Sequence, residues 1–238
     1  MVGVSLHQPN YLPWTKLLAK IQASDVYIAY DTVQFTRSEY HNRQRLRCRG
    51  ETVLLSVPVR RAKSRQAICD VELDNSRDWR GYHLRIIEQE YRRTPYFSEV
   101  FGLLQEVYGR QHHSLADLNL DLIDALCGYL GYTTTIVRAS QFTHAGDNTE
   151  RLIQLTRAVG ADEHLTSTWG TEREYIDWCR VTAAGITVRS QDFRHPVYRQ
   201  QHDPFFPDLS VVDLLFAHGA AAAASMIAQS TRFPAVSA

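Results

Sequence analysis

Hydrophobic and polar positions change their spacing twice within the first thirty residues. A short apolar run at 2–6 is followed by a turn with two prolines, apolar residues at helical spacing through 14–21, and a second apolar run at 26–30. Short apolar runs bounded by turn residues predict strands, and spacings of three and four residues predict an amphipathic helix. The chain therefore opens with a predicted strand-helix-strand unit, whose parallel strands require a right-handed crossover.

The middle of the chain has a different pattern. An apolar run at 53–57 follows a basic stretch and is closed by Pro58, which predicts a hairpin or an edge extension. Three later segments carry apolar residues three and four apart, and we expect helices there: 79–91, 96–108 and 115–130. Together they predict a helical insertion over about residues 76–131.

Alternation of strand and helix patterns returns after this insertion. Strands are expected at 133–137, 164–168 and 186–190, with helices at 149–159 and 172–182 between them. An aromatic, proline-rich loop at 195–207 leads to a last helix, which begins near Ser210 with an S-x-x-D capping pattern. Repeated alternation predicts an α/β fold with a doubly wound, mostly parallel, Rossmann-like sheet. No repeat or long linker divides the chain, so we expect one domain over residues 1–238.

Composition narrows the classes of function. The 238 residues are 44% hydrophobic and 22% charged, as in an ordinary globular domain, and 26 basic residues balance 26 acidic ones. Zero net charge provides no field for gathering nucleic acid or anionic membranes, and no uninterrupted apolar run reaches the roughly 18 to 20 residues of a membrane span. Four widely separated cysteines without a secretory segment predict free thiols and a cytoplasmic location.

The turn after the first strand is the strongest candidate for chemistry. It reads His7-Gln8-Pro9-Asn10-Tyr11 and places an imidazole, two carboxamides and a phenol within five residues. Ligands of open α/β sheets bind at the carboxyl ends of the strands, where this turn lies. The competing interpretation is a turn stiffened by proline in which Asn10 only caps the helix, and the spacing leaves both open.

Further polar residues lie near the ends of other elements. Asp31 and Gln34 follow the second strand, where they would orient His7 or a ligand hydroxyl, or else only cap their own loop. In the late loop, Tyr198 and Gln200 alternate with aromatic residues, which suits a lid over a ligand as well as a loop packed on the core.

A basic run at 41–49 contains four arginines in a neutral protein. Arginine pairs bidentately with carboxylate or phosphate, so the run predicts an anionic substrate such as a nucleotide-linked or phosphopantetheine-linked group, unless it is a solvated strand. Cys48 among these arginines is a candidate nucleophile, with packing as the simpler role. The ten histidines show no metal-binding spacing, so we expect no metal site.

Taken in order, these motifs resemble the WbqC-like family. The resemblance rests first on the opening motif His7-Gln8-Pro9-Asn10-Tyr11-Leu12-Pro13 and on the block Leu209-Ser210-Val211-Val212-Asp213-Leu214-Leu215-Phe216. Shorter matches lie between them: Lys20, Asp25-Val26, Asp31 with Gln34-Phe35, Asn42-Arg43 with Arg45, Val57-Pro58-Val59, Gly170 with Tyr175, Gly185-Ile186 with Val188, and Tyr198 with Gln200.

The resemblance implies an accessory enzyme of surface-polysaccharide or natural-product biosynthesis that transfers a small acyl or aminoacyl group from a thioester-type donor to an amine. Such a reaction needs a base, donors to the developing oxyanion and a clamp for the donor. We expect His7 to be the base, because imidazole titrates near neutrality. We expect Asp31 or Asp213 to orient His7, and Gln8, Asn10 and Gln34 to donate hydrogen bonds to the carbonyl oxygen. Arg43 and Arg45 are expected to bind the anionic part of the donor. Tyr198 and Gln200 are expected to close over the substrate, and Tyr11 and Asn42 to make further contacts with it.

Three alternatives remain open at this stage. Hydrolysis of a thioester or amide would use the same groups, with water replacing the amine. Nucleotidyl transfer or ATP-dependent activation is less favoured, because Pro13-Trp14 stands where a second histidine is expected and no glycine-rich phosphate loop follows. A non-catalytic ligand-binding protein is the third. We expect no bound cofactor; a small-molecule substrate is the expected partner, and an acyl carrier protein bearing a phosphopantetheine-linked donor is a further candidate.

Overall fold

A computed structural model describes residues 1–37, 39–61, 65–167 and 175–235 of the chain. Its main sheet has six strands, in the order β5 (Thr135–Arg138), β2 (Val26–Ala29), β1 (Gly3–His7), β6 (Glu163–Ser167), β7 (Thr187–Phe193) and β8 (Thr231–Arg232). The first five are parallel, and only β8 is antiparallel to its neighbour. The predicted α/β, doubly wound, mostly parallel sheet is confirmed.

The order of the strands shows where the chain reverses direction. From β1 the chain moves outward to β2 and then β5, and it returns to place β6 directly beside β1 on the other side. The reversal point therefore lies between β1 and β6. In open sheets of this kind, ligands bind outside the carboxyl ends of the strands at such a point.

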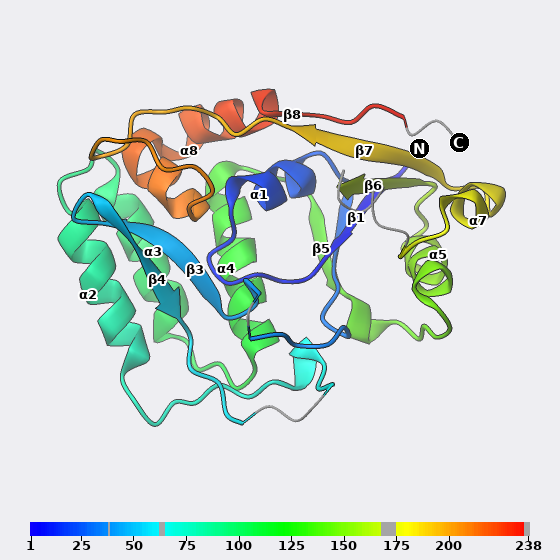
Figure 1. Ribbon diagram of the computed structural model, residues 1–238, viewed down its shortest axis with the longest axis horizontal. Coiled ribbons are helices and arrows are strands. Elements are labelled where there is room, and N and C mark those ends of the chain that lie inside the picture. The colour runs from blue at the N-terminus through cyan, green and yellow to red at the C-terminus, as the bar shows by residue number, and fades with distance from the viewer. Residues whose placement is uncertain (38, 62–64, 168–174, 236–238) are drawn as a thin grey trace.

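Helices cover both faces of the sheet (Figure 1). The crossover helices are α1 (Thr15–Gln22), α5 (Asn148–Ala158) and α7 (Trp178–Ala183). Alternate residues of β2 face different layers, because Tyr27 and Ala29 belong to the large core cluster that includes α1, whereas Ile28 packs with Leu155 of α5.

The same alternation decides which way β1 points its polar side chains. Val4 packs with the α5 layer, so Ser5 and His7 face the layer of α1. A hydrogen bond of 2.8 Å between the hydroxyls of Ser5 and Ser24, just after α1, agrees with this orientation. The end of β1 therefore presents His7 to the side of the sheet that α1 covers.

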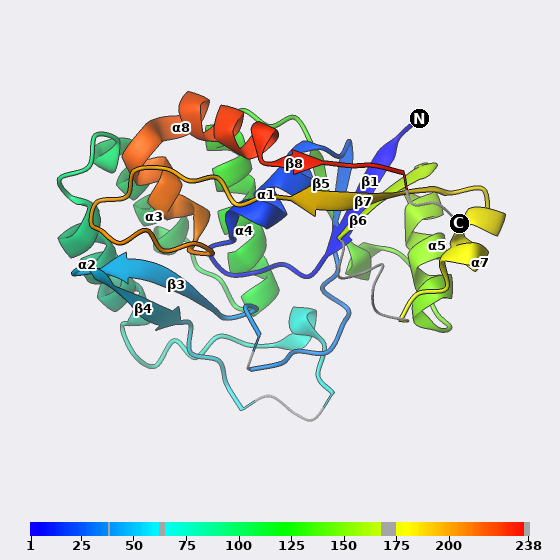
Figure 2. The same ribbon diagram turned by 45° about the horizontal axis from the view of Figure 1, so that its top comes forward.

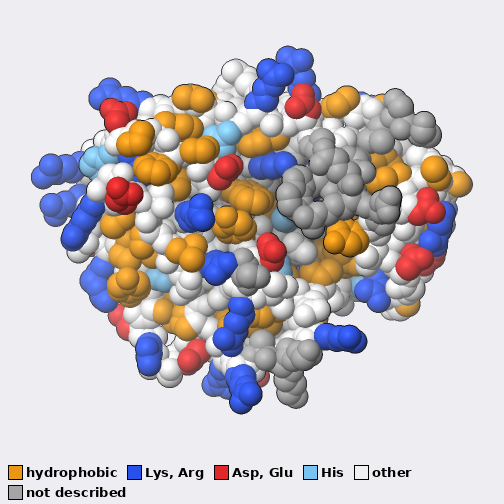
Figure 3. All heavy atoms as spheres, in the orientation of Figure 1, with side chains coloured by type: hydrophobic (Ala, Val, Ile, Leu, Met, Phe, Trp, Pro, Cys, Tyr) orange, Lys and Arg blue, Asp and Glu red, His pale blue; other side chains and the backbone are white. Residues whose placement is uncertain are grey.

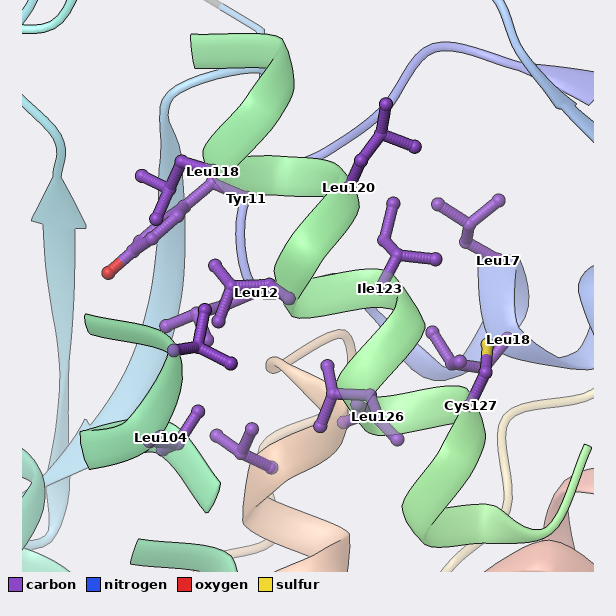
Figure 4. Packing of buried hydrophobic residues seen from close by; sticks show 14 of the residues in the cluster. Tyr11, Leu12, Leu17, Leu18, Leu104, Leu118, Leu120, Ile123, Leu126 and Cys127 are labelled. Carbon is purple, nitrogen blue, oxygen red and sulfur yellow. The ribbon is translucent and has the colours of Figure 1, made fainter. Parts of the chain in front are cut away.

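The predicted hairpin and helical insertion are both present and lie at the end of the molecule opposite α5 and α7 (Figures 1 and 2). The hairpin pairs β3 (Arg43–Cys48) with β4 (Glu51–Ser56), and the insertion comprises α2 (Trp79–Tyr91), α3 (Phe97–Gly109) and α4 (Leu115–Leu130). Two short 3-10 turns, η1 (Ile68–Asp70) and η2 (Ala139–Gln141), complete these connections. Figure 4 shows α4 at the centre of the core, with Leu118 and Leu126 beside residues of the first turn and α1.

The last helix, α8 (Val211–Gln229), has a length and a mean hydropathy of 1.7 that would fit a membrane span. The expectation that no segment qualifies is therefore too strict, because it considered only uninterrupted apolar runs. Half of the apolar window is buried against the rest of the protein, as in the core helix of a soluble protein. The helix is also kinked at Gly219, whose φ of 69° lies in the left-handed region.

The region between β6 and α7 is only partly described. The helix expected at 172–182 appears as α7, Trp178–Ala183, and residues 172–174 lie outside the described residues. The same holds for Thr168, expected at the end of the strand, and for Gly170, which contributes to the family resemblance.

Candidate functional site

A cavity of about 490 Å³ lies at the carboxyl ends of β1, β6 and β7, on the face that α1 covers. It therefore occupies the point where the order of the strands reverses. Twelve residues line it: His7, Gln8, Asn10, Trp14, Lys16, Leu17, Lys20, Glu39, Tyr40, His41, Ser167 and Gln191. Three of them, His7, Gln8 and Asn10, are sequence candidates from the first turn.

The conformation of the first turn favours a site over a simple cap. The residue that caps α1 is Trp14, without a side-chain hydrogen bond, so the interpretation of Asn10 as the helix cap is wrong. Asn10 is instead 4% exposed and lines the cavity. Leu12 in the same turn has φ 41°, a left-handed conformation that costs a non-glycine residue on the order of 1–3 kcal/mol. Packing holds this conformation, because Leu12 is fully buried.

Asn119 of α4 ties two walls of the cavity together. Its side-chain amide donates to the carbonyl oxygens of Pro9, at 2.8 Å, and of His41, at 2.7 Å. The backbone N–H of Tyr11 adds a bond of 3.2 Å to the oxygen of Tyr40. Sequence analysis missed Asn119, although a polar residue on the buried face of an apolar helix is the signal that could have found it.

Tyr11 points away from the cavity, so its assignment to substrate binding is wrong. The side chain is fully buried beside α4 (Figure 4). Its hydroxyl makes a hydrogen bond of 2.8 Å with Nδ1 of His83 and a second one with the hydroxyl of Tyr108. Tyr11 therefore anchors the turn in the core.

His7 is neutral in this environment. Its Nδ1–H donates to the carbonyl oxygen of Gln8 at 2.9 Å, which leaves Nε2 as an acceptor. Burial, and next the positive charge of Lys20, lower the pKa of His7 to about 3. The expectation that this imidazole titrates near neutrality is therefore wrong, and its Nε2 is a hydrogen-bond acceptor of low basicity.

His41 offers the complementary group. It is 2% exposed, and its Nδ1 accepts the backbone N–H of Thr36 at 3.2 Å. The proton of the neutral ring is therefore on Nε2, which has no hydrogen-bond partner within the described part of the chain. Burial lowers the pKa of His41 to about 4, so the ring stays a neutral donor at the cavity wall.

Lys20 of α1 lines the cavity, although sequence analysis named it only within the family resemblance and did not assign it to the site. Its side chain is 4% exposed on the cavity wall, and no described carboxylate lies within ion-pair distance of it. Burial, followed by the charge of Lys16 one turn earlier, lowers the pKa of Lys20 to about 7. The available signal was a pair of lysines four residues apart in a helix whose other residues are largely apolar.

Asp31 and Gln34 do not join this site. Both carboxylate oxygens of Asp31 accept from Ser140, one from its backbone N–H at 2.9 Å and the other from its hydroxyl at 2.7 Å. Asp31 therefore caps the loop after β5 and does not orient His7, which corrects that expectation. Gln34 is exposed and does not line the cavity, so donation from it to a bound carbonyl group is not supported.

The arginines of β3 also lie elsewhere. Arg45 is exposed, and neither Arg43 nor Arg45 lines the cavity, so the expected convergence of these guanidinium groups with His7 is wrong. Asn42 donates from its side chain to the oxygen of Val57 at 2.8 Å, which ties the two ends of the hairpin together. Cys48 at the end of β3 does not line the cavity either. Figure 3 shows Lys and Arg side chains spread over one face, at its rim and near its middle, rather than gathered at one point.

Asp213, Tyr198 and Gln200 meet one another in a separate place, which we call the Asp213 cluster. Asp213 accepts hydrogen bonds from the hydroxyls of Tyr91, at 2.8 Å, and Tyr198, at 2.9 Å. The side chain of Gln200 exchanges two bonds of 2.8 Å with the backbone of Phe206. These residues do not line the cavity, so their expected roles in orienting His7 and closing over the substrate are not supported.

The remaining member of the Asp213 cluster is Arg47. Its side chain is fully buried, lies 4.4 Å above the ring of Phe206 and donates to the oxygen of His202 at 2.6 Å. These contacts hold the loop at 195–207 against the hairpin and α8. The lid interpretation of this loop therefore gives way to the alternative, in which its aromatic residues pack on the core.

Metal ligands are not grouped in the described ranges. No three His, Cys, Asp or Glu side chains among the described residues lie close enough together to hold a metal ion. The polar groups that line the cavity include two lysine amines, two imidazoles, three carboxamides, two hydroxyls and the carboxylate of Glu39.

Comparison of the sequence with known proteins shows which family the chain belongs to. The sequence model of the WbqC-like protein family matches residues 8–225. This chain belongs to the WbqC-like family. This WbqC-like protein is also 32% identical over 225 residues to the uncharacterized protein Rv1507c of Mycobacterium tuberculosis, and the alignment covers 93% of this chain and 96% of that one. No solved structure gives a significant match.

Proposed function

We propose that this WbqC-like protein transfers a small acyl or aminoacyl group from a thioester donor to an amine in the cavity between β1 and α1. The observation that carries the proposal is the amine of Lys20, buried on the cavity wall without a carboxylate of the described residues within ion-pair distance and with a pKa lowered to about 7. Amide formation requires a group that takes a proton from the attacking nitrogen at neutral pH. Lys20 meets this requirement better than any other group lining the cavity.

Lys20 replaces His7 as the proposed base. A base is most effective when its pKa lies near the working pH, and a pKa of about 3 makes His7 a poor proton acceptor. Nε2 of His7 makes no hydrogen bond to a described residue and can accept one, which suits it to orient the N–H of the acceptor amine. In the proposed reaction Lys20 takes the proton, and His7 positions the nucleophile.

Donors for the developing oxyanion are also present in the lining of the cavity. The Nε2–H of His41 has no partner among described residues, and a neutral imidazole donates to an oxyanion without bringing a charge into the ground state. The carboxamide groups of Gln8 and Asn10, in the first turn, are further donors. Lys16 is the cation at the cavity that remains for an anionic portion of the donor.

The test uses the full chain with S-acetyl and S-glycyl pantetheine as donors and glucosamine as acceptor. Free thiol is measured with and without the amine, and products are identified by mass. The proposal predicts thiol release that depends on glucosamine, together with an amide product. Equal thiol release without the amine would establish hydrolysis in place of transfer, and the absence of release with either donor would contradict the proposed reaction.

Matched variants locate the reaction. We expect Lys20→Arg to abolish most of the amine-dependent thiol release, because arginine keeps the positive charge but does not deprotonate. Arg45→Lys is the control, since it makes the opposite exchange at an exposed position outside the cavity. Equal loss in both variants would place the chemistry elsewhere.

A further inference from the structure

The chain uses lysine very sparingly. Of its 26 basic residues, 23 are arginines and three are lysines: Lys16, Lys20 and Lys63. Two of the three line the same cavity from one face of α1. A site that needed only a positive charge would be served by arginine, which this chain uses almost everywhere else, so the cavity favours a chemistry that arginine lacks.

That chemistry is the reactivity of a neutral primary amine. Lys20 is 4% exposed, faces the 490 Å³ cavity, and has no described carboxylate within ion-pair distance to hold its proton. Desolvation and a neighbouring cation are the two features that convert a lysine into a nucleophile in Schiff-base enzymes, and Lys16 supplies the neighbouring cation.

The other ionisable groups that the structure describes around Lys20 do not oppose this state. His7 of β1 stays neutral, and so does His164 of β6, whose pKa burial lowers to about 3. His41 on the facing wall is also neutral, and the acidic residue lining the cavity, Glu39, is exposed. Near neutral pH, Lys20 therefore gains and loses its proton while the charges of the described groups around it stay nearly constant.

We propose that Nζ of Lys20 forms a reversible imine with the carbonyl carbon of a small 2-oxo acid, whose carboxylate pairs with the ammonium of Lys16. This activity goes beyond acyl transfer and does not depend on it, because it requires only the amine and the cavity. Lysines four residues apart on a helix have their Cβ atoms about 5–6 Å apart, close enough for one small ligand to reach both. A 2-oxo acid carries its carboxylate next to its carbonyl carbon and matches such a pair.

The reaction balances without an oxidant or a cofactor. The lone pair of Nζ attacks the carbonyl carbon, and the electrons of the carbon–oxygen π bond move onto the oxygen. A proton moves from nitrogen to that oxygen to give the carbinolamine. The carbon–oxygen bond then breaks, and the second hydrogen of the amine leaves with the oxygen as water, so that an imine and one water molecule are formed.

The test is reductive trapping: the full chain is incubated with pyruvate and sodium cyanoborohydride. The protein is then digested, and mass spectrometry of the peptides locates the adduct among four primary amines, the N-terminus and the three lysines. The proposal predicts one reduced adduct on Lys20, formed at a rate that rises with pH and levels off above about 7. Adducts spread at similar rates over all four amines, or no adduct on Lys20, would overturn it. Because the wild-type chain supplies this result, it does not depend on whether a variant folds.

Two controls separate the parts of the proposal. Lys16→Met removes the cation that lowers the pKa of Lys20, so trapping of the uncharged acetaldehyde should also slow, and trapping of pyruvate should slow by about tenfold more, the worth of one charge-assisted hydrogen bond. Equal slowing with both probes would contradict the role of Lys16 as the carboxylate partner. The thiol-release measurement is independent of this test, so acyl transfer without an adduct would reject the imine alone, and an adduct without acyl transfer would reject the proposed function alone.

Discussion

Two regions of this protein bury polar side chains, and they treat them in opposite ways. In the Asp213 cluster, the carboxylate of Asp213 accepts two tyrosine hydroxyls, and Arg47 donates from Nη2 to the loop that covers it, although Nε and Nη1 of Arg47 have no hydrogen-bond partner among the described residues. In the cavity, Lys20 has no carboxylate partner and Nε2 of His41 has no hydrogen-bond partner among described residues. Buried polar groups in folded proteins are normally bonded.

This difference in hydrogen bonding separates polar residues that stabilise the fold from polar residues that are available to a ligand. Groups that bond one another stabilise a loop and leave no capacity for another molecule. Groups that are buried beside a cavity without partners cost stability, and residues with perturbed pKa values in a cleft are candidates for function. By this criterion the cavity is the stronger candidate for the functional region, although each region contains three of the site residues predicted from the sequence.

The largest effect should follow from removing the proton acceptor of the cavity. Lys20→Arg is expected to lower kcat for amine-dependent thiol release by on the order of 10²- to 10⁴-fold, the usual contribution of a positioned base. Steady-state kinetics with S-glycyl pantetheine and glucosamine measure this loss. If kcat of Lys20→Arg stayed within twofold of the wild-type value, the proposed functional difference between the cavity and the Asp213 cluster would be contradicted.

The next largest effect should appear in the Asp213 cluster and in stability alone. Asp213→Ala leaves two buried tyrosine hydroxyls without an acceptor, so the free energy of unfolding should fall by about 2–4 kcal/mol. Urea denaturation measures the fall, and the rate of thiol release per folded molecule should stay unchanged. Loss of rate at unchanged stability would show that the cluster acts in catalysis.

A third effect depends on pH. The pKa of Lys20 is about 7 in the folded chain and near 10.4 in an unfolded one, so between these values the unfolded chain binds more protons and wild-type stability rises with pH. Lys20→Met removes this dependence. It should therefore be the more stable protein below pH 7, by one to a few kcal/mol, with an advantage that shrinks toward pH 10. Thermal unfolding of both proteins at pH 6, 8 and 10 measures the change, and a constant difference would contradict the lowered pKa.

The smallest effect concerns the arginines of β3. Arg45→Ala changes an exposed side chain outside the cavity and should alter the free energy of unfolding by less than about 0.5 kcal/mol. The rate of thiol release should also stay near the wild-type value. If the KM for the thioester donor rose tenfold or more, the result would instead support the prediction that Arg45 binds the anionic part of the donor.

Much of the fold could be predicted from the spacing of apolar residues. The opening strand-helix-strand unit, the hairpin and the three inserted helices all follow from local patterns, because each element has to bury one face. The neighbours of β1 could not be predicted in this way. The pairing of β1 with β6 joins segments about 160 positions apart, and no local pattern encodes it.

The site was only partly predictable, for a related reason. The motif at 7–11 identified the cavity through His7, Gln8 and Asn10, but residue type alone did not show that Tyr11 turns into the core. Lys20 was overlooked because a lysine in an amphipathic helix is normally solvated, and only the packing of α1 against the sheet buries it. The protonation state of His7 likewise depends on burial and on Lys20, which is remote in sequence.

The pKa of Lys20 tests the central claim most directly. A chain labelled with ¹³C at the ε-carbon of lysine contains only three such signals, and NMR spectra recorded from pH 5 to 11 follow each one. The account predicts that the Lys20 signal titrates with a midpoint of about 7. A midpoint near 10.4, the value of an exposed lysine, would contradict the account.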